Sequence, residues 1–304
     1  MQIYLPIAEM TVPVESIFLL GTFVGFLSGV FGIGGGFLAT PFLIFMGIPP
    51  AVAVGTQANQ LVAASFSGMM AHWRKGNVDV QMGSVMMAGG LVGSLIGIFV
   101  FKMLQVLGQI DFIISILYVL FLGTVGLLML YESFFSFFKK KTVRSEFNSQ
   151  KLSPFFMALP YKMRFPRSKL YISALVPAGI GFLGGLMVSI MGIGGGFLLV
   201  PAMIYVLGMP TLLVAGTSLF QIIFTSAFAA VMHAVANHTL DMVLAILLIS
   251  GGVIGARAGA SVSRTITGAH ARIILAILVL TVCTQLGAQL FIRPAELYST
   301  VVRK

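Results

Sequence analysis

Charged residues are scarce in this sequence, and acidic residues are the scarcest of them. The 304 residues include 8 Asp and Glu and 18 Lys and Arg, so charged residues make up 9% of the chain, against about 25% in an average soluble domain. Because 58% of the residues are hydrophobic, too little polar surface is left to cover a water-soluble globule. The sequence therefore predicts an all-α polytopic membrane protein.

Residues that bind metals or form disulfides are also few. The chain has one cysteine, Cys283, and four histidines, and these do not have the spacing of metal ligands. We therefore expect no cofactor and no metal site. Acids are nearly absent from the apolar segments, and no Ser/His or paired-Asp arrangement stands out, so we do not expect an enzyme.

The net charge of +10 comes largely from one segment. Nine of the 18 Lys and Arg lie between Lys139 and Lys169, which is typical of a cytoplasmic loop in a membrane protein. We therefore expect the chain to contact a lipid bilayer and not nucleic acid. The first basic residue is Arg74, so we do not predict a cleavable signal peptide at the N-terminus.

The two halves of the chain repeat each other. The sequence Gly-Ile-Gly-Gly-Gly-Phe-Leu occurs at 32–38 and again at 192–198, an offset of 160 residues. With two single-residue insertions the match continues, and it pairs Gln60 with Gln221, His72 with His233 and Asp79 with Asp241. Such a match indicates an internal duplication. We predict a first transmembrane repeat over 1–131, a basic cytoplasmic connector over 132–170 and a second transmembrane repeat over 171–304.

The opening segment of each half, 17–47 and 171–207, is too long for one plain crossing and is interrupted by glycines. If each segment crosses once with a kink, each half has four crossings and the halves are parallel. If each is a re-entrant hairpin of two half-helices, three transmembrane helices follow and the halves are inverted. The parallel arrangement requires a cytoplasmic N-terminus, yet the N-terminal tail carries Glu9 and Glu15 and no basic residue. We therefore favour inverted repeats.

The glycine runs are the first candidate binding sites. A run of glycines ends a helix, since each costs about 1 kcal/mol relative to Ala. The helix that starts again after the run points free N–H groups and a partial positive charge at the break, which suits an anion. The alternative is that the glycines only let helices pack closely. The backbone candidates are Gly34, Gly35, Gly36 and Phe37 in the first half and Gly194, Gly195, Gly196 and Phe197 in the second.

The helix after each break carries most of the remaining candidates. Its polar or small residues recur every four positions, from Gln60 to His72 and from Gln221 to His233, which predicts one narrow stripe on each helix. Polar residues at this depth either line a wet path or form hydrogen bonds between helices. The candidate substrate ligands are Gln57, Asn59, Gln60, Thr217, Ser218, Gln221, Thr225 and, in the third helix of the second half, Arg257. His233 is a candidate for proton coupling.

Two patterns predict structure instead of chemistry. The third helix of each half contains Gly-xxx-Gly-xxx-Gly, at 89–97 and at 251–259, which is typical of closely packed helices in membranes. Asp79 and Asp241 stand just before these helices, where Asp is a favoured N-cap. We expect packing from the glycines and capping from the acids.

Together these motifs resemble the sulfite exporter TauE/SafE family, also called TSUP or DUF81. The resemblance rests on the duplicated glycine run, the Pro and Gly-Thr that follow it, and the stretch His-Trp-Arg-Lys-Gly-Asn-Val-Asp at 72–79. It covers nearly the whole chain except the connector, although the second copy of that stretch lacks the basic pair and the glycine at 237–240. The resemblance implies a multi-pass transporter of the bacterial or archaeal cytoplasmic membrane, for small sulfur-containing anions such as sulfite, sulfoacetate and other organosulfonates.

The function we predict is secondary transport of a small anion by alternating access at a midplane site between the two glycine breaks. The sequence has no nucleotide-binding motif, so an ion gradient or the membrane potential is the expected energy source. The alternative is an anion channel of the same fold. The sequence leaves the oligomeric state open, with a homodimer as one option.

Overall fold

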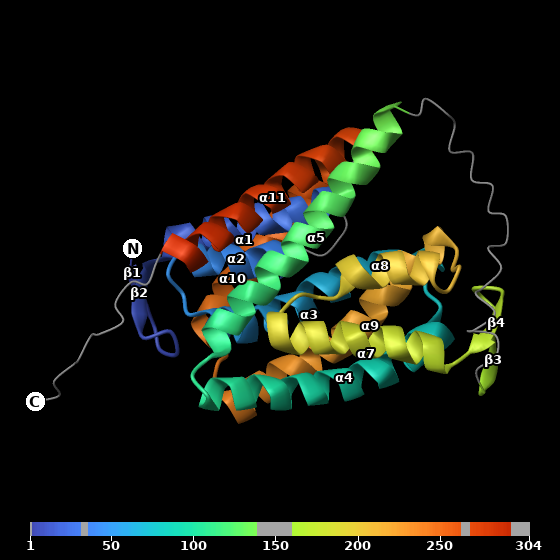
Figure 1. The fold of residues 1–304 in the computed structure, drawn as a ribbon, viewed down its shortest axis with the longest axis horizontal. Coiled ribbons are helices and arrows are strands. Elements are labelled where there is room, and N and C mark those ends of the chain that lie inside the picture. Colours follow the sequence, from blue (N-terminus) through green and yellow to red (C-terminus); the bar gives the residue numbers. More distant parts are fainter. Residues whose placement is uncertain (1, 32–35, 139–159, 263–267, 293–304) are drawn as a thin grey trace, which may run out of the picture.

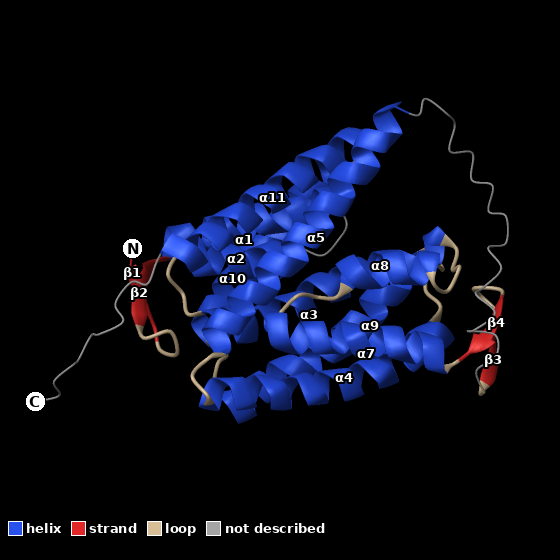
Figure 2. Ribbon diagram, viewed as in Figure 1, coloured by secondary structure: helices blue, strands red, loops and turns tan. Residues whose placement is uncertain are grey.

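The computed structural model describes residues 2–31, 36–138, 160–262 and 268–292. These residues are mostly helical, with two short two-stranded sheets (Figure 2). The predicted fold class, an all-α polytopic membrane protein, is confirmed.

The two halves contain the same elements in the same order. In the first half these are β1 (Gln2–Leu5), β2 (Met10–Pro13), α1 (Val14–Phe31), α2 (Gly36–Phe45), α3 (Pro50–Arg74), α4 (Val80–Val106) and α5 (Ile110–Phe138). In the second half they are β3 (Lys162–Phe165), β4 (Leu170–Ser173), α7 (Leu175–Met191), α8 (Gly196–Tyr205), α9 (Thr211–Met232), the π-helical turn η1 (His233–Asn237), α10 (Met242–Val262) and α11 (Gly268–Ile292).

Five of the described helices are long and apolar enough to cross a membrane: α4, α5, α9 with its π-helical turn, α10 and α11. Helix α3 is equally long, but Gln57, Asn59 and Gln60 lower its hydropathy. Polar residues are expensive in contact with lipid. Accordingly, α3 packs against α2, α5, α7, α9 and α10, and Gln57 and Gln60 are buried.

Each glycine-broken segment folds back on itself. A Cβ atom on Gly184 of α7 would lie 3.0 Å from the Leu199 side chain of α8, although 15 residues of continuous helix would span about 22 Å. In the first half, the ring of Phe23 in α1 contacts that of Phe42 in α2 edge to face, at 5.8 Å between centroids. Both segments therefore fold as helical hairpins, and their re-entry into a bilayer stays a prediction.

A β-hairpin precedes each helical hairpin, and this feature extends the duplication. The β1–β2 and β3–β4 hairpins are related by the same offset of 160 residues, and both have a left-handed residue at the turn, Glu9 with φ 51° and Lys169 with φ 54°. The β3–β4 hairpin begins at Lys162, within the range 132–170 that we predict as connector, and α5 extends to Phe138. The two β-hairpins lie at opposite ends of the molecule (Figure 1). The orientation of the halves in a bilayer stays a prediction.

Close packing of glycine-rich helices joins the two halves. Helix α4 of the first half packs along α7 of the second, and α10 of the second half packs along α1 of the first. Glycines meet the facing backbone directly: a Cβ atom on Gly89 would collide with the Ala178 carbonyl oxygen, and one on Gly251 would collide with the Phe18 carbonyl oxygen. The predicted packing role of the third-helix glycines is confirmed.

The predicted N-caps are also present. The Asp79 carboxylate accepts a hydrogen bond from the Met82 N–H at 3.0 Å, and the Asp241 carboxylate accepts from the N–H groups of Val243 and Leu244 at 3.0 and 3.1 Å. Each carboxylate thereby satisfies N–H groups in the first turn of a helix that would otherwise have no acceptor.

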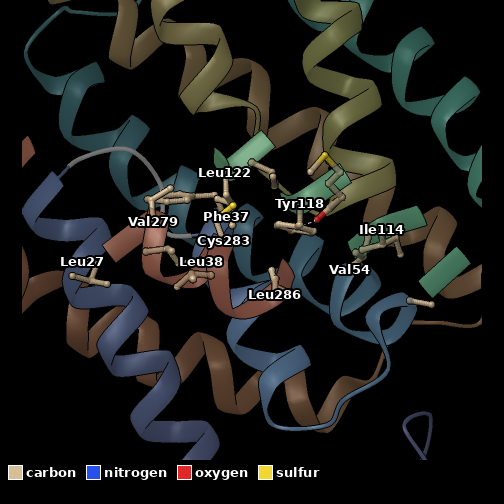
Figure 3. Close-up of a cluster of buried hydrophobic side chains, with 14 of the residues drawn as sticks. Leu27, Phe37, Leu38, Val54, Ile114, Tyr118, Leu122, Val279, Cys283 and Leu286 are labelled. Atoms are coloured by element: carbon tan, nitrogen blue, oxygen red, sulfur yellow. Dashed lines mark hydrogen bonds between the residues drawn. The ribbon is translucent and has the colours of Figure 1, made fainter. Parts of the chain in front are cut away.

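One hydrophobic cluster surrounds both breaks. Phe37 and Leu38 follow the first break, Met191 and Ile193 flank the start of the second, and all four belong to the same buried cluster as Tyr118 of α5. Figure 3 shows Phe37 beside Leu122 and Cys283, with the Tyr118 hydroxyl in a hydrogen bond. The two interrupted segments therefore share one core.

Candidate functional site

The second glycine break depends on two left-handed residues. Helix α7 ends at Gly192, which has φ 66°, and α8 begins after Gly195, which has φ 62°. Only glycine adopts this conformation without steric cost. The chain reverses between them within four residues, which leaves a helix C-terminus and a helix N-terminus close together.

The C-terminus of α7 and the N-terminus of α8 differ in their hydrogen-bond partners. At the end of α7, the Tyr118 hydroxyl donates a hydrogen bond to the Met191 carbonyl, and His233 Nε2 lies 2.9 Å from the Ser189 carbonyl oxygen. Two of the carbonyl groups in the last turn of the helix thus have side-chain partners. The N-cap residue of α8 is Gly195, which has no side chain to accept from the first-turn N–H groups. Its partial positive charge is available to an anion.

The start of α2 and the second break both lie against helix α3. A Cβ atom on Gly36 would lie 2.5 Å from Leu61 Cδ2, and one on Gly194 would lie 2.9 Å from the same methyl carbon. Gln57, one turn earlier in α3, is also near both. A Cβ atom on Gly36 would lie 3.3 Å from the Gln57 Nε2, and one on Gly192 would lie 3.5 Å from the Gln57 Cβ. Leu61 and Gln57 therefore lie near both the start of α2 and the second break.

Gln57 is the candidate residue with the most unusual environment. Its side chain is only 1% exposed, and its Oε1 has no hydrogen-bond partner within the described residues. A buried amide without a partner is destabilising by about 1–3 kcal/mol, and such groups require an explanation. An amide can present either its NH₂ group or its oxygen after rotation of its last bond, so Gln57 can offer a donor to an anion.

Gln60 and Gln221 lie at matched places in the two halves. The Gln60 Nε2 is 3.5 Å from the Leu248 carbonyl oxygen, and the Gln221 Nε2 is 3.4 Å from the Gly181 carbonyl oxygen. Each amide also abuts a glycine of the crossing helices, Gly252 or Gly90, at 2.9 and 2.8 Å from the Cβ position. Their amide nitrogens thus serve hydrogen bonding between helices, while both Oε1 atoms lack a partner in the described structure.

The other side-chain candidates of α9 are engaged with backbone. The Ser218 hydroxyl donates to the Ala215 carbonyl, the Thr225 hydroxyl donates to the Gln221 carbonyl, and the Thr217 hydroxyl oxygen accepts from the Asp79 N–H. Asn59 on α3 is half-buried, and Arg257 is exposed on α10. The structure thus brings Gln57 to the breaks and leaves Arg257 on the surface.

Some of the backbone candidates are found at the helix starts that the sequence predicts. Gly36 and Gly196 are the first residues of α2 and α8, so the helices restart where the sequence predicts, and Phe37 and Phe197 follow them. The Phe37 side chain is buried in the hydrophobic cluster, so only its backbone can face the break. Gly34 and Gly35 lie outside the described residues.

A second polar cluster surrounds His233, which is fully buried. Besides Ser189, the ring contacts the Asn237 amide at 3.2 Å and the Thr239 hydroxyl at 3.3 Å through Nδ1. The Ser189 hydroxyl in turn lies 2.5 Å from the Ser94 hydroxyl of α4. Sequence reasoning missed Ser94, Ser189 and Tyr118; the one available signal was that each is a polar residue in an apolar segment.

The buried polar residues of the described chain include no Lys or Arg. The buried acids, Asp79 and Asp241, accept hydrogen bonds from backbone N–H groups. The polar groups around the breaks are therefore neutral amides, hydroxyls and backbone dipoles. Such a site holds an ion by oriented dipoles and not by a fixed counter-charge.

Comparison with known families decides the identity of the fold. The family model described as Sulfite exporter TauE/SafE matches residues 17–286. The chain belongs to the TauE/SafE family. The match includes both glycine breaks, Gln57 and His233, so the site described above lies within the region shared by TauE/SafE proteins.

Curated TauE/SafE relatives support a transport role. The chain is 27% identical to the probable membrane transporter protein YunE of Bacillus subtilis, over 81% of this chain and 87% of that protein. It is 31% identical to a probable membrane transporter protein of Xylella fastidiosa strain Temecula1, over 77% and 80% of the two chains. YjnA of Bacillus subtilis, named a probable membrane transporter protein, is 26% identical over 87% and 96%. No solved structure matches the chain. This TauE/SafE protein is a membrane transporter.

Proposed function

We propose that the protein is a secondary transporter of a small sulfur-containing anion, such as sulfite or sulfoacetate, in the cytoplasmic membrane of a bacterium or archaeon. The observation that carries this proposal is that the start of α2 and the second break both lie against Gln57 and Leu61. The family description names sulfite export, which supports a sulfur oxyanion as the first substrate to test.

The proposed site binds the anion between the uncapped N-terminus of α8 and the Gln57 amide. Backbone N–H groups at a helix start and an amide NH₂ are good donors to the several oxygens of a sulfonate or sulfite group. With no buried Lys or Arg in the described residues, binding is weak enough for release on either side.

Alternating access is the proposed mechanism. The two helical hairpins come from opposite ends of the molecule (Figure 1), and Leu61 lies near both the start of α2 and the second break. In this mechanism the halves move relative to each other and expose the site to one side at a time. A channel of the same fold would need a continuous path past Leu61.

Uptake of radiolabelled sulfite and sulfoacetate into liposomes that contain the purified protein tests the substrate. Gln57→Leu is expected to lower the flux by about tenfold or more, because the anion loses a buried hydrogen-bond donor. The matched control is Gln285→Leu, since Gln285 is exposed on α11. Equal flux for Gln57→Leu and wild type, or no flux of either anion through folded wild-type protein, contradicts the proposal.

Counterflow separates a carrier from a channel. Liposomes loaded with unlabelled substrate accumulate external label transiently if one site alternates between the two sides. A channel dissipates the gradient without this overshoot. Absence of the overshoot while flux is present therefore favours the channel.

A further inference from the structure

His233 and its counterpart His72 have different surroundings in the two halves. In the second half, α9 passes into the π-helical turn η1 at His233, and the side chain is 0% exposed. The matched His72 of the first half is only half-buried, and its Nδ1 has no hydrogen-bond partner in the described chain. Only the second half thus surrounds this histidine with polar groups.

The hydrogen bonds fix the tautomer of the neutral ring. The Ser189 carbonyl oxygen can only accept, so His233 Nε2, at 2.9 Å, carries a hydrogen. Nδ1 is then an acceptor, and both the Asn237 NH₂ group at 3.2 Å and the Thr239 hydroxyl at 3.3 Å can donate to it. The neutral ring is fully satisfied.

The same surroundings also fit a ring with a second proton. A proton on Nδ1 turns this atom into a donor, and Thr239 Oγ1 can accept from it after its hydroxyl rotates. The Asn237 Oδ1 is buried and has no partner in the described structure. Rotation of this amide exchanges its NH₂ group for that oxygen, which then faces Nδ1. Two arrangements of the same side chains thus match the two charge states.

The ring is joined directly to the second break. Ser189, which accepts from Nε2, lies in the last turn of α7, three residues before Gly192. A helix C-terminus carries a partial negative charge and favours a cation beside it. A charge change at His233 therefore acts on the end of α7 and on the turn that shapes the proposed anion site.

Few other charges face this ring. Helices α7 and α9 contain no other ionisable residue. From α4, the Phe101 ring packs edge to face against the His233 ring, at 4.7 Å between centroids. The next residue, Lys102, is exposed. On α5, the Tyr118 hydroxyl is bonded to the Met191 carbonyl, and Asp111 accepts from the Ala51 N–H. Beyond η1, His238 is exposed and the Asp241 carboxylate is held by backbone N–H groups.

We propose that His233 is a proton-binding site of this transporter, and that the anion crosses together with a proton carried on Nδ1. The proton adds to the Nδ1 lone pair from water on one side and leaves to water on the other, so no other bond is made or broken. The imidazolium is held by the Ser189 carbonyl, Thr239 and the rotated Asn237 amide. This inference rests on the proposed function.

The test uses full-length protein in liposomes with sulfoacetate as the probe and a trapped pH dye. Wild type is expected to move protons when sulfoacetate is added, and to accumulate sulfoacetate in response to a pH gradient. His233→Gln keeps a donor near the Nε2 position but cannot take a proton. It is expected to lose proton movement and to lower gradient-driven accumulation by about tenfold, while counterflow at equal pH continues. The matched control His72→Gln is expected to behave as wild type.

A second variant covers the case in which His233→Gln does not fold. Asn237→Asp keeps the size of the side chain and places a permanent acceptor beside Nδ1, which favours the charged ring. The pH of half-maximal accumulation is expected to move upward. Proton movement that persists in His233→Gln, or is absent from wild type while counterflow proceeds, overturns the inference alone. Absence of counterflow in folded wild type overturns the proposed function as well.

Discussion

The hydroxyl oxygen of Thr217 accepts a hydrogen bond from the backbone N–H of Asp79 at 3.0 Å. The two residues belong to different halves, and Thr56 repeats the contact with the Asp241 N–H, also at 3.0 Å. Helix α9 thus holds the N-cap residue of α4, and helix α3 holds the N-cap residue of α10.

The β-hairpins complete these crossed contacts. Asp79 also accepts from the N–H of Ser168 at 3.1 Å and from its hydroxyl at 2.5 Å, and the Arg167 guanidinium donates to the Val78 carbonyl at 2.6 Å. Asp241 accepts from the Ile7 N–H at 3.1 Å. Each carboxylate therefore accepts from three donors, and one of the three at Asp79 is a hydroxyl.

Asp79→Ala is expected to lower the free energy of unfolding by about 2 kcal/mol, because a helix cap is lost and buried donors lose their acceptor. Asp79→Asn, which retains a capping oxygen, is expected to lose less. Thermal unfolding of purified protein in detergent measures both. Equal midpoints for Asp79→Ala and wild type would show that the contact does not contribute.

Two glycines with the same backbone angle allow a matched test of the second break. Gly192 and Gly208 have φ 66° and 68°, but a Cβ atom on Gly192 would lie 3.0 Å from the Val54 carbonyl oxygen, whereas nothing lies within 4 Å of one on Gly208. Gly208→Ala is expected to lose about 1 kcal/mol from the left-handed backbone and to transport normally. Gly192→Ala is expected to abolish sulfoacetate flux, because α7 must move away from α3. Similar flux in the two variants contradicts a functional role for the break.

Leu61 is expected to set the size of the transported anion, since its side chain lies near both the start of α2 and the second break. Leu61→Ala removes that side chain and is expected to raise the flux of bulky alkanesulfonates relative to sulfite. Leu207→Ala is the control, because Leu207 is equally buried in another cluster and both changes should destabilise by about 2–5 kcal/mol. An unchanged flux ratio in Leu61→Ala refutes the role.

Much of the fold could be predicted from the repeat and from local rules. The glycine runs mark where α2 and α8 begin, Asp79 and Asp241 are caps, and the glycines at 89–97 pack against another helix. Each of these depends on chemistry within a few residues or on a helical period. Such signals survive in one sequence without knowledge of neighbours.

The β-hairpins and the cluster at His233 could not be predicted in this way. The strands are four residues long, too short for a clear alternating pattern, and β3 lies in a basic segment that reads as connector. Ser94 and Ser189 are separated by 95 residues, and Tyr118 and Met191 by 73. Which donor meets which carbonyl depends on how distant helices cross, and no local pattern records this.

The crossed contacts also determine the order in which the protein can be completed in the cell. The Ile7 N–H and the Asp241 carboxylate are 234 residues apart, which corresponds to roughly ten to fifty seconds of synthesis. During that time β1–β2 has no acceptor at Asp241 and α1 has no α10 to pack against. Insertion of the first half must therefore produce a waiting intermediate in the membrane, and the first half made alone is expected to be a substrate for quality-control proteases.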